Sequence, residues 1–223
     1  MLTLAIDTST NILSVALVRG DEVLASINEQ TKNNQSALLM SKIEKMMTDC
    51  HLKPSDLEKI AVAFGPGSYT GVRVGVAVAK SLAYALAIPV VGISSLEIMT
   101  RAAVLDELCV AMIDARRGTV FAGVYHGCSG SLIPDGHYTL DVLLSQLNLE
   151  EDEITFVGDG AVIHKVRLLA ASEHAQVKDE SEFEHSKAVM LAHLAKDRSP
   201  QENIHALKPS YLRQTEAEMN AGV

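Results

Sequence analysis

The segment with the clearest chemical potential is a glycine-rich loop from Gly65 to Gly71, which reads Gly-Pro-Gly-Ser-Tyr-Thr-Gly. It follows a short apolar run and precedes a long stretch of Val, Ala and Gly, so it should connect a strand to a helix. Backbone N–H groups at a helix N-terminus can bind a phosphate or another anion. The loop matches neither a Walker A motif nor a dinucleotide-binding fingerprint. A capped strand-to-helix turn that binds nothing accounts for the same residues.

Carboxylates end several of the predicted strands. Asp7 ends the first strand, Asp114 ends a strand in the second half, and Asp159 lies between two glycines after another strand. Such carboxylates can hold a metal or a phosphate, although Asp is also a common turn residue. Asp7 is the strongest candidate for a surviving ligand. The residues that could form a vestigial phosphate site are Asp7, Gly65, Gly67, Ser68 and Thr70.

Other catalytic patterns are missing from the sequence. The eight histidines form no His-x-x-x-His pair, so no zinc site on a helix is predicted. Ser68 lies in a glycine-flanked turn, but no His or Asp is marked by its position as a partner. The cysteines Cys50, Cys109 and Cys128 are widely spaced, which favours idle thiols in a reducing cytoplasm. We therefore predict no catalytic residue, no metal and no cofactor.

The composition is that of an ordinary globular protein. The 223 residues are 48% hydrophobic and 21% charged, which is enough apolar content for one large or two small domains. No stretch resembles a secretory signal or a membrane span, so a cytoplasmic protein without membrane contact is expected. The net charge of −9 is poorly suited to gripping a phosphate backbone. If RNA is involved, a partner should hold most of it.

The apolar periodicity of the first half predicts three strands followed by a helix, a strand, a helix and a strand. The expected strands are residues 2–7, 12–19, 22–28, 59–64 and 90–93, and the expected helices are 35–50 and 70–86. Ser94 and Glu97 have the spacing of a capping box for a further helix. This order resembles the ribonuclease-H-like unit.

A second and weaker copy of this order is predicted after residue 100. Its strands would be residues 108–114, 119–125, 132–139 and 154–157, with helices at 140–147 and near 186–197. Two such units give an actin-like (ASKHA) α/β fold, each unit with a mixed sheet flanked by helices. The predicted domains are residues 1–100 plus 207–223, and a smaller or degenerate unit over 101–206. No sequence repeat supports the duplication, which rests on element order.

The predicted helix after the glycine loop carries two apolar rows. Small residues recur every four positions from Gly71 to Ala87, and a row of larger residues runs from Val74 to Leu86. Small residues let another backbone approach closely. One row should pack on the sheet and the other could pack on a helix of a partner. The sequence does not say which row faces outward.

With these residues assembled, the chain resembles the TsaB family, also called YeaZ. Four runs carry the resemblance: Ala5-Ile-Asp-Thr-Ser-Thr, Gly65-Pro-Gly-Ser-Tyr-Thr-Gly-Val-Arg-Val-Gly, Ile113-Asp-Ala-Arg-Arg-Gly-Thr-Val-Phe, and Lys208-Pro-Ser-Tyr-Leu-Arg. The second run is the most specific, and the four together span nearly the whole chain. Relatives of the TsaD type carry a metal-binding His-x-x-x-His pair on the first helix, where this chain has Gln35 nearby.

The resemblance implies a scaffold rather than an enzyme. It implies that the chain binds and activates TsaD in threonylcarbamoyl transfer to the adenosine next to the anticodon, with TsaE as the ATPase of the complex. It also implies a possible homodimer, and contact with tRNA only through the complex. The partner surface would lie on helices 35–50 and 70–86. The implied interface residues are Leu38, Leu39, Ile43, Met46, Gly71, Val72, Gly75, Val76, Ala79 and Ala83.

Two other functions compete with the scaffold. An actin-like ATP-binding enzyme, either an ATPase or a phosphotransferase, would use Asp7, the glycine loop and the Gly-Asp-Gly run around Asp159. Against it, the loops lack the paired phosphate motifs that grip both ends of a nucleotide's phosphates. A peptidase with Ser68 as nucleophile is the less favoured alternative.

Overall fold

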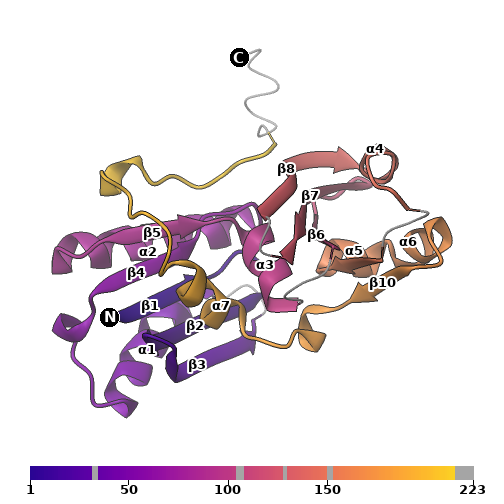
Figure 1. Cartoon of the computed structure of the whole chain (residues 1–223). Helices are drawn as coiled ribbons and strands as arrows, with labels where there is room; N and C mark the ends of the chain where they lie inside the picture. Colours follow the sequence, from indigo (N-terminus) through magenta and orange to yellow (C-terminus); the bar gives the residue numbers. More distant parts are fainter. Residues whose placement is uncertain (32–34, 104–107, 128–129, 150–152, 214–223) are drawn as a thin grey trace.

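Two five-stranded mixed sheets, each flanked by helices, make up the chain (Figure 1). The computed structural model describes residues 1–31, 35–103, 108–127, 130–149 and 153–213. Cys128 therefore lies outside the described residues, and so do residues 214–223, which belong to the predicted first domain. Within the described ranges, none of the helices is long and apolar enough to cross a bilayer.

The first sheet has the strand order β3-β2-β1-β4-β5. Its strands are β1 (Leu2–Asp7), β2 (Ile12–Arg19), β3 (Glu22–Gln30), β4 (Lys59–Ala63) and β5 (Val90–Ile93). The first three strands pair antiparallel, whereas β4 and β5 extend the sheet in parallel. Its connections include α1 (Gln35–Asp49), the short η1 (Pro54–Asp56) and α2 (Tyr69–Leu86), and α3 (Ser95–Ala103) follows β5. All five strands and the first two helices lie where the sequence predicts them.

The second sheet repeats this topology in the order β10-β9-β6-β7-β8. Its elements are β6 (Leu108–Asp114), β7 (Thr119–His126), β8 (Gly130–Thr139), α4 (Leu140–Leu144), β9 (Ile154–Val157), α5 (Asp159–Ile163), α6 (Lys165–Ala171) and β10 (Ala175–Lys178). An antiparallel meander is again followed by two parallel strands. The predicted actin-like α/β fold with two such units is confirmed. The elements β10, α5 and α6 have no counterpart among the predicted ones.

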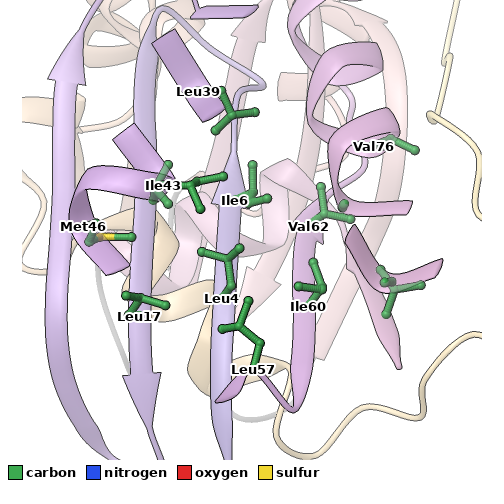
Figure 2. Close-up of a cluster of buried hydrophobic side chains, with 14 of the residues drawn as sticks. Leu4, Ile6, Leu17, Leu39, Ile43, Met46, Leu57, Ile60, Val62 and Val76 are labelled. Carbon is green, nitrogen blue, oxygen red and sulfur yellow. The ribbon is translucent and has the colours of Figure 1, made fainter. Parts of the chain in front are cut away.

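Strand alternation gives the first sheet two different faces. Leu4 and Ile6 of β1 point to the side covered by α1 and α2, where they pack with large side chains such as Ile43 (Figure 2). Ala5 points to the opposite side and belongs to a separate cluster rich in alanine. Because side chains alternate along a strand, Asp7 lies on the same side as Ala5. The last residue of β1 is thereby directed away from α1 and α2.

The alanine face is covered by α7 (Lys187–Leu194), which corrects the prediction that a helix near 186–197 completes the second unit. Ala188, Leu191 and Ala192 of α7 pack against Ala5 and the other small residues of β1, β2 and β4. Small side chains on the sheet let the helix approach closely, which its own alanines also favour. The part of the chain that packs on the first sheet after the second unit therefore begins at α7, before the predicted boundary at residue 207.

Polar contacts fix both ends of α7 on the first sheet. At its N-terminus the Ser14 Oγ of β2 accepts a hydrogen bond from the Ala188 N–H over 3.0 Å. At its C-terminal end the buried Lys59 Nζ of β4 donates to the Ala195 carbonyl over 2.8 Å. A cation is favourable there because the end of a helix carries partial negative charge. Lys187, the first residue of α7, is therefore held beside the end of β1.

A candidate functional site between the two sheets

A cavity of about 580 Å³ lies between the two units, where the chain leaves several strands. The turn after β1, the glycine loop after β4, the turn after β6 and the start of α5 all line it, together with residues 210–213. The sequence-predicted candidates Gly67, Ser68 and Thr70 are lining residues, as are Asp114 and Asp159. The structure thus brings residues from both halves of the chain to one cleft.

The Asp7 carboxylate, the strongest predicted ligand, is fully buried behind this cleft. One of its oxygens accepts hydrogen bonds from the Ser9 N–H (2.8 Å) and the Ser9 Oγ–H (2.6 Å). The Lys187 Nζ lies 3.7 Å from the other oxygen, which has no hydrogen-bond partner within the described structure. The Lys187 side chain is only 3% exposed. An internal ammonium thus sits beside the carboxylate that a metal or phosphate would need.

Lys187 also binds two groups on either side of Asp7. Its Nζ lies 2.7 Å from the Glu180 carboxylate and donates to the Thr10 Oγ1 over 2.7 Å. Burial by itself lowers the pKa of Lys187, but the Asp7 and Glu180 carboxylates outweigh it, so the net pKa lies above its ordinary value. The lysine is therefore charged at neutral pH. We call Asp7, Thr10, Glu180 and Lys187 the lysine cluster.

Neither Lys187 nor Glu180 is among the residues that the sequence singles out. Lys187 opens an apolar helix about 180 residues after Asp7, and Glu180 lies in the short turn η3 (Glu180–Glu182). Their only sequence signal is a charged residue at the start of an otherwise apolar helix. Local spacing cannot reveal a partner so far away along the chain.

Neighbouring backbone atoms leave no room for a side chain at two of the loop glycines. A Cβ atom on Gly67 would lie 2.3 Å from the Ser9 carbonyl oxygen, and one on Gly65 would lie 2.9 Å from the Ser210 carbonyl oxygen. Gly65 has φ = +109°, a conformation that side chains disfavour. The loop therefore needs glycine in order to pack against the first turn and the C-terminal segment. A bound phosphate is not required to account for them.

Ser68 caps α2 instead of facing a base. Its Oγ accepts a hydrogen bond from the Gly71 N–H over 3.3 Å, and its own N–H donates to the Ser9 carbonyl over 2.7 Å. The described residues that line the cleft include no histidine. In the part of the chain that the structure covers, no three His, Cys, Asp or Glu side chains converge as a metal site. Among the described lining residues there is thus no histidine that could activate Ser68 as a nucleophile.

Asp159 is the carboxylate in the cleft with the most altered environment. It opens α5, and its Oδ1 accepts a hydrogen bond from the Asp114 N–H over 3.0 Å. Burial raises the pKa of Asp159, with a further contribution from Asp114, although the two backbone hydrogen bonds and Lys187 oppose the rise. A carboxyl group with a raised pKa can act as an acid or base, but here its oxygen is used to join α5 to β6.

Comparison with known proteins agrees with this geometry. A family model described as TsaD, tRNA N6-adenosine threonylcarbamoyltransferase, matches residues 22–221. The tRNA threonylcarbamoyladenosine biosynthesis protein TsaB of Bacillus subtilis (strain 168) is 37% identical over 222 residues, covering 98% of this chain and 96% of that protein. The chain belongs to the TsaB family.

Other relatives and solved structures extend the match. TsaB of Escherichia coli (strain K12) is 33% identical over 135 residues, or 56% of this chain and 58% of that protein. A Pseudomonas aeruginosa crystal structure described as having similarity to peptidase YEAZ superposes with a TM-score of 0.79, at 26% identity, and covers 95% of this chain and 99% of that one. A second structure, YeaZ from the same organism, gives 0.72 at 25% identity over the same shares. The TsaB names place the chain in tRNA threonylcarbamoyladenosine biosynthesis.

The burial of the side chains corrects the interface residues that the TsaB resemblance implied. Nine of the ten lie inside the first unit: Leu39, Ile43, Met46, Gly71, Val72, Gly75, Val76, Ala79 and Ala83. The row of small residues faces the sheet because it allows close packing there. A Cβ atom on Gly75 would lie 2.4 Å from the Thr8 Oγ1 and 3.7 Å from Val62. Only Leu38 is half-buried and within reach of another chain.

The other apolar row lies on a half-buried flank of α2, whereas the exposed positions of the helix include Arg73, Ala77 and Tyr84. Val74, Val78, Leu82 and Leu86 are half-buried and pack only partly against the core, and Leu38 of α1 does the same. We call these five residues the outer row. The two helices stay the contact elements that the TsaB resemblance predicts, and the outer row is their more accessible apolar row.

Replacing Lys187 by Met should destabilise the fold by about 3–5 kcal/mol, because it leaves buried carboxylates without their cation. The lysine's contribution is fully present at neutral pH, since its raised pKa keeps it charged there. The loss relative to the native chain should therefore be as large at mildly alkaline pH as at neutral pH. Urea unfolding at several pH values measures both effects.

The exposed Lys165 of α6 provides a matched control, because Lys165→Met should change stability by less than about 0.5 kcal/mol. Adding Glu180→Gln to Lys187→Met should recover part of the loss. Equal unfolding midpoints for Lys187→Met and the native chain would show that the lysine cluster does not stabilise the fold.

Replacing Asp159 by Asn should leave stability at neutral pH unchanged or raised. A raised pKa in the folded state means that the ionised carboxylate opposes folding above that pKa, and the amide oxygen of Asn can still accept both backbone hydrogen bonds. The gain should disappear below pH ~4, near the ordinary carboxyl pKa, where Asp159 is protonated in both states. Chemical unfolding of both chains across this pH range tests the sign, and a variant that is less stable than the native chain at neutral pH would contradict it.

Proposed function

We propose that this chain is a non-catalytic scaffold that binds and activates TsaD during threonylcarbamoyl transfer to the adenosine next to the anticodon of tRNA. The observation that carries the proposal is the lysine cluster. Lys187 occupies the immediate surroundings of Asp7, and its removal would leave Asp7 and Glu180 as uncompensated buried charges. A metal ion that coordinated Asp7 would have to compete with this buried ammonium.

The remaining groups of the cleft support the same proposal. Ser68 is engaged as a helix cap, and Asp159 joins α5 to β6. An acid–base or nucleophilic mechanism needs a nucleophile within hydrogen-bond reach of a base. The hydroxyl–carboxylate pairs that the described residues do form, Ser9 with Asp7 and Thr10 with Glu180, lie on buried carboxylates that are already paired with Lys187. The cleft therefore serves better as a rigid junction between the two units than as a reaction site.

The outer row is the surface that we propose for TsaD. Half-buried valines and leucines at helical spacing can pack on a partner's helix through ridges and grooves. The buried glycines and alanines beneath them hold α2 close to its own sheet, so this surface is fixed before a partner arrives. A second copy of the chain could use the same surface when TsaD is absent.

The other partners follow from this assignment. We propose TsaE as the ATPase of the complex and the cytoplasm as its location. We also propose that tRNA binds mainly through the complex, in keeping with the net charge of −9.

Val78→Glu should abolish copurification with TsaD while the chain stays folded. Val78 is half-buried in the outer row, so a carboxylate there can reach water in the free chain but would be desolvated in a packed helix contact. Copurification of the two chains, with circular dichroism of the free variant, measures the result.

Ala77→Glu is the matched control, because Ala77 is the neighbouring residue on α2 and is exposed on a different flank. It should retain the complex. In contrast, Ala79→Glu places the same charge at a fully buried position and should unfold the chain. Retention of TsaD by folded Val78→Glu would remove the outer row from the interface.

A further inference from the structure

A second cavity, of about 550 Å³, lies outside the cleft, between α2 and the C-terminal segment. Residues of α2 form one wall, and residues 204–211 form the other, beginning with η4 (Ile204–Ala206). The Lys80 Nζ ties the two walls together, because it donates to the carbonyls of His205 (3.2 Å) and Leu207 (3.0 Å). We call this cavity the outer groove. The outer row lies on another flank of α2.

The charge of the outer groove is opposite to that of the chain. Arg73, Lys80 and Lys208 line it, and none of its described lining residues is acidic. The sequence of α2 contains no Asp or Glu. Among the residues that the structure describes, these three cations form no ion pair. The chain as a whole has a net charge of −9, so this groove is a local cationic surface on an acidic protein.

Exposed tyrosines lie in the groove and beside it. Their exposed fractions are 72% for Tyr84 and 50% for Tyr211 in the groove, and 49% for the neighbouring Tyr69. Tyr84 and Tyr211 line the groove, and the Tyr69 ring lies 5.2 Å from that of Tyr211. The Arg73 guanidinium lies 5.0 Å from the centre of the Tyr69 ring and donates to its hydroxyl. Exposed rings beside arginine offer flat faces on which another flat group can stack.

The cationic track continues from the groove into the cleft. Tyr211 lines both cavities, and the cleft adds Arg116 and Arg213. The cleft also contains the carboxylates of Asp114 and Asp159, so its charge is mixed, whereas the charged residues in the described lining of the outer groove are all cations. An extended row of cations matches a chain of phosphates better than it matches a single carboxylate.

From this surface we infer that the outer groove binds a single-stranded segment of RNA. An unpaired base would stack on Tyr84 or Tyr211 above the apolar floor, and the phosphates would follow Arg73, Lys80 and Lys208. Proteins that hold single strands commonly combine stacked aromatic rings with a cationic path for the backbone. The inference rests on the proposed function, since the RNA would be an unpaired loop of the tRNA substrate. It places part of the tRNA contact on this chain.

Fluorescence anisotropy with a labelled anticodon stem-loop RNA tests the inference on the full chain, without TsaD, at low salt. The native chain should bind the loop more tightly than a blunt duplex of the same composition. Tyr84→Ser should weaken binding on the order of tenfold, because it removes a stacking face, whereas Tyr84→Phe should retain it. Lys208→Gln should reduce the slope of log affinity against log salt by about 0.7, the value for one phosphate on a single strand.

Lys165→Gln, on α6 in the second unit, removes an exposed lysine far from the groove in sequence and should leave binding unchanged. Equal affinity for Tyr84→Ser and Tyr84→Phe, or no binding by the native chain, would overturn the inference. Displacement of the RNA by a polyglutamate peptide at equal charge concentration would also overturn it, in favour of an acidic peptide as the occupant. Because TsaD is absent from this assay, failure here leaves the outcome of the Val78→Glu copurification untouched.

Discussion

The arrangement of the whole chain depends on one buried ammonium group. Lys187 Nζ lies among Asp7 at the end of β1, Thr10 in the following turn, and Glu180 beyond the second sheet. An unpaired buried charge is strongly destabilising, so the buried Lys187 holds these three segments together. Strand alternation directs Asp7 to the face covered by α7, and the Ser14 contact with Ala188 sets the start of that helix. The lysine cluster thereby joins the two units.

The lysine cluster also occupies polar groups that could otherwise bind a ligand. The Lys187 ammonium balances the charge of Asp7, and the backbones of Ser9 and Ser210 occupy the space beside the loop glycines. Little room is therefore left for a ligand beside Asp7 and the loop. The polar groups that would do chemistry are used to hold the fold. What remains exposed is α2, which carries the outer row on one flank and the cationic outer groove on another. A rigid interior with a shaped and charged surface is what the proposed scaffold function requires.

Strand and helix positions could be predicted from apolar periodicity, because β1, β2 and α2 keep their periods without interruption. Which row of α2 faces the sheet could not be predicted, because both rows are apolar. Packing of the small row against Thr8 and Val62 decides which one is buried. The location of α7 was also beyond the sequence, because an apolar helix fits either sheet until its alanines meet the alanine face of the first. For the same reason Asp7 could be found as a strand-end carboxylate, but its partner Lys187 could not.

The most direct test of the account is threonylcarbamoyl transfer to tRNA by purified TsaD and the other components, with this chain carrying Asp7→Asn and Ser68→Ala together. Asp7→Asn keeps an oxygen that can accept the Ser9 hydrogen bonds, and Glu180 still pairs with Lys187. If the chain supplies a surface and no reacting group, the double variant should support transfer within about twofold of the native chain once equal folding and TsaD binding are confirmed. Loss of transfer by a folded variant that still binds TsaD would show that these residues take part in the chemistry.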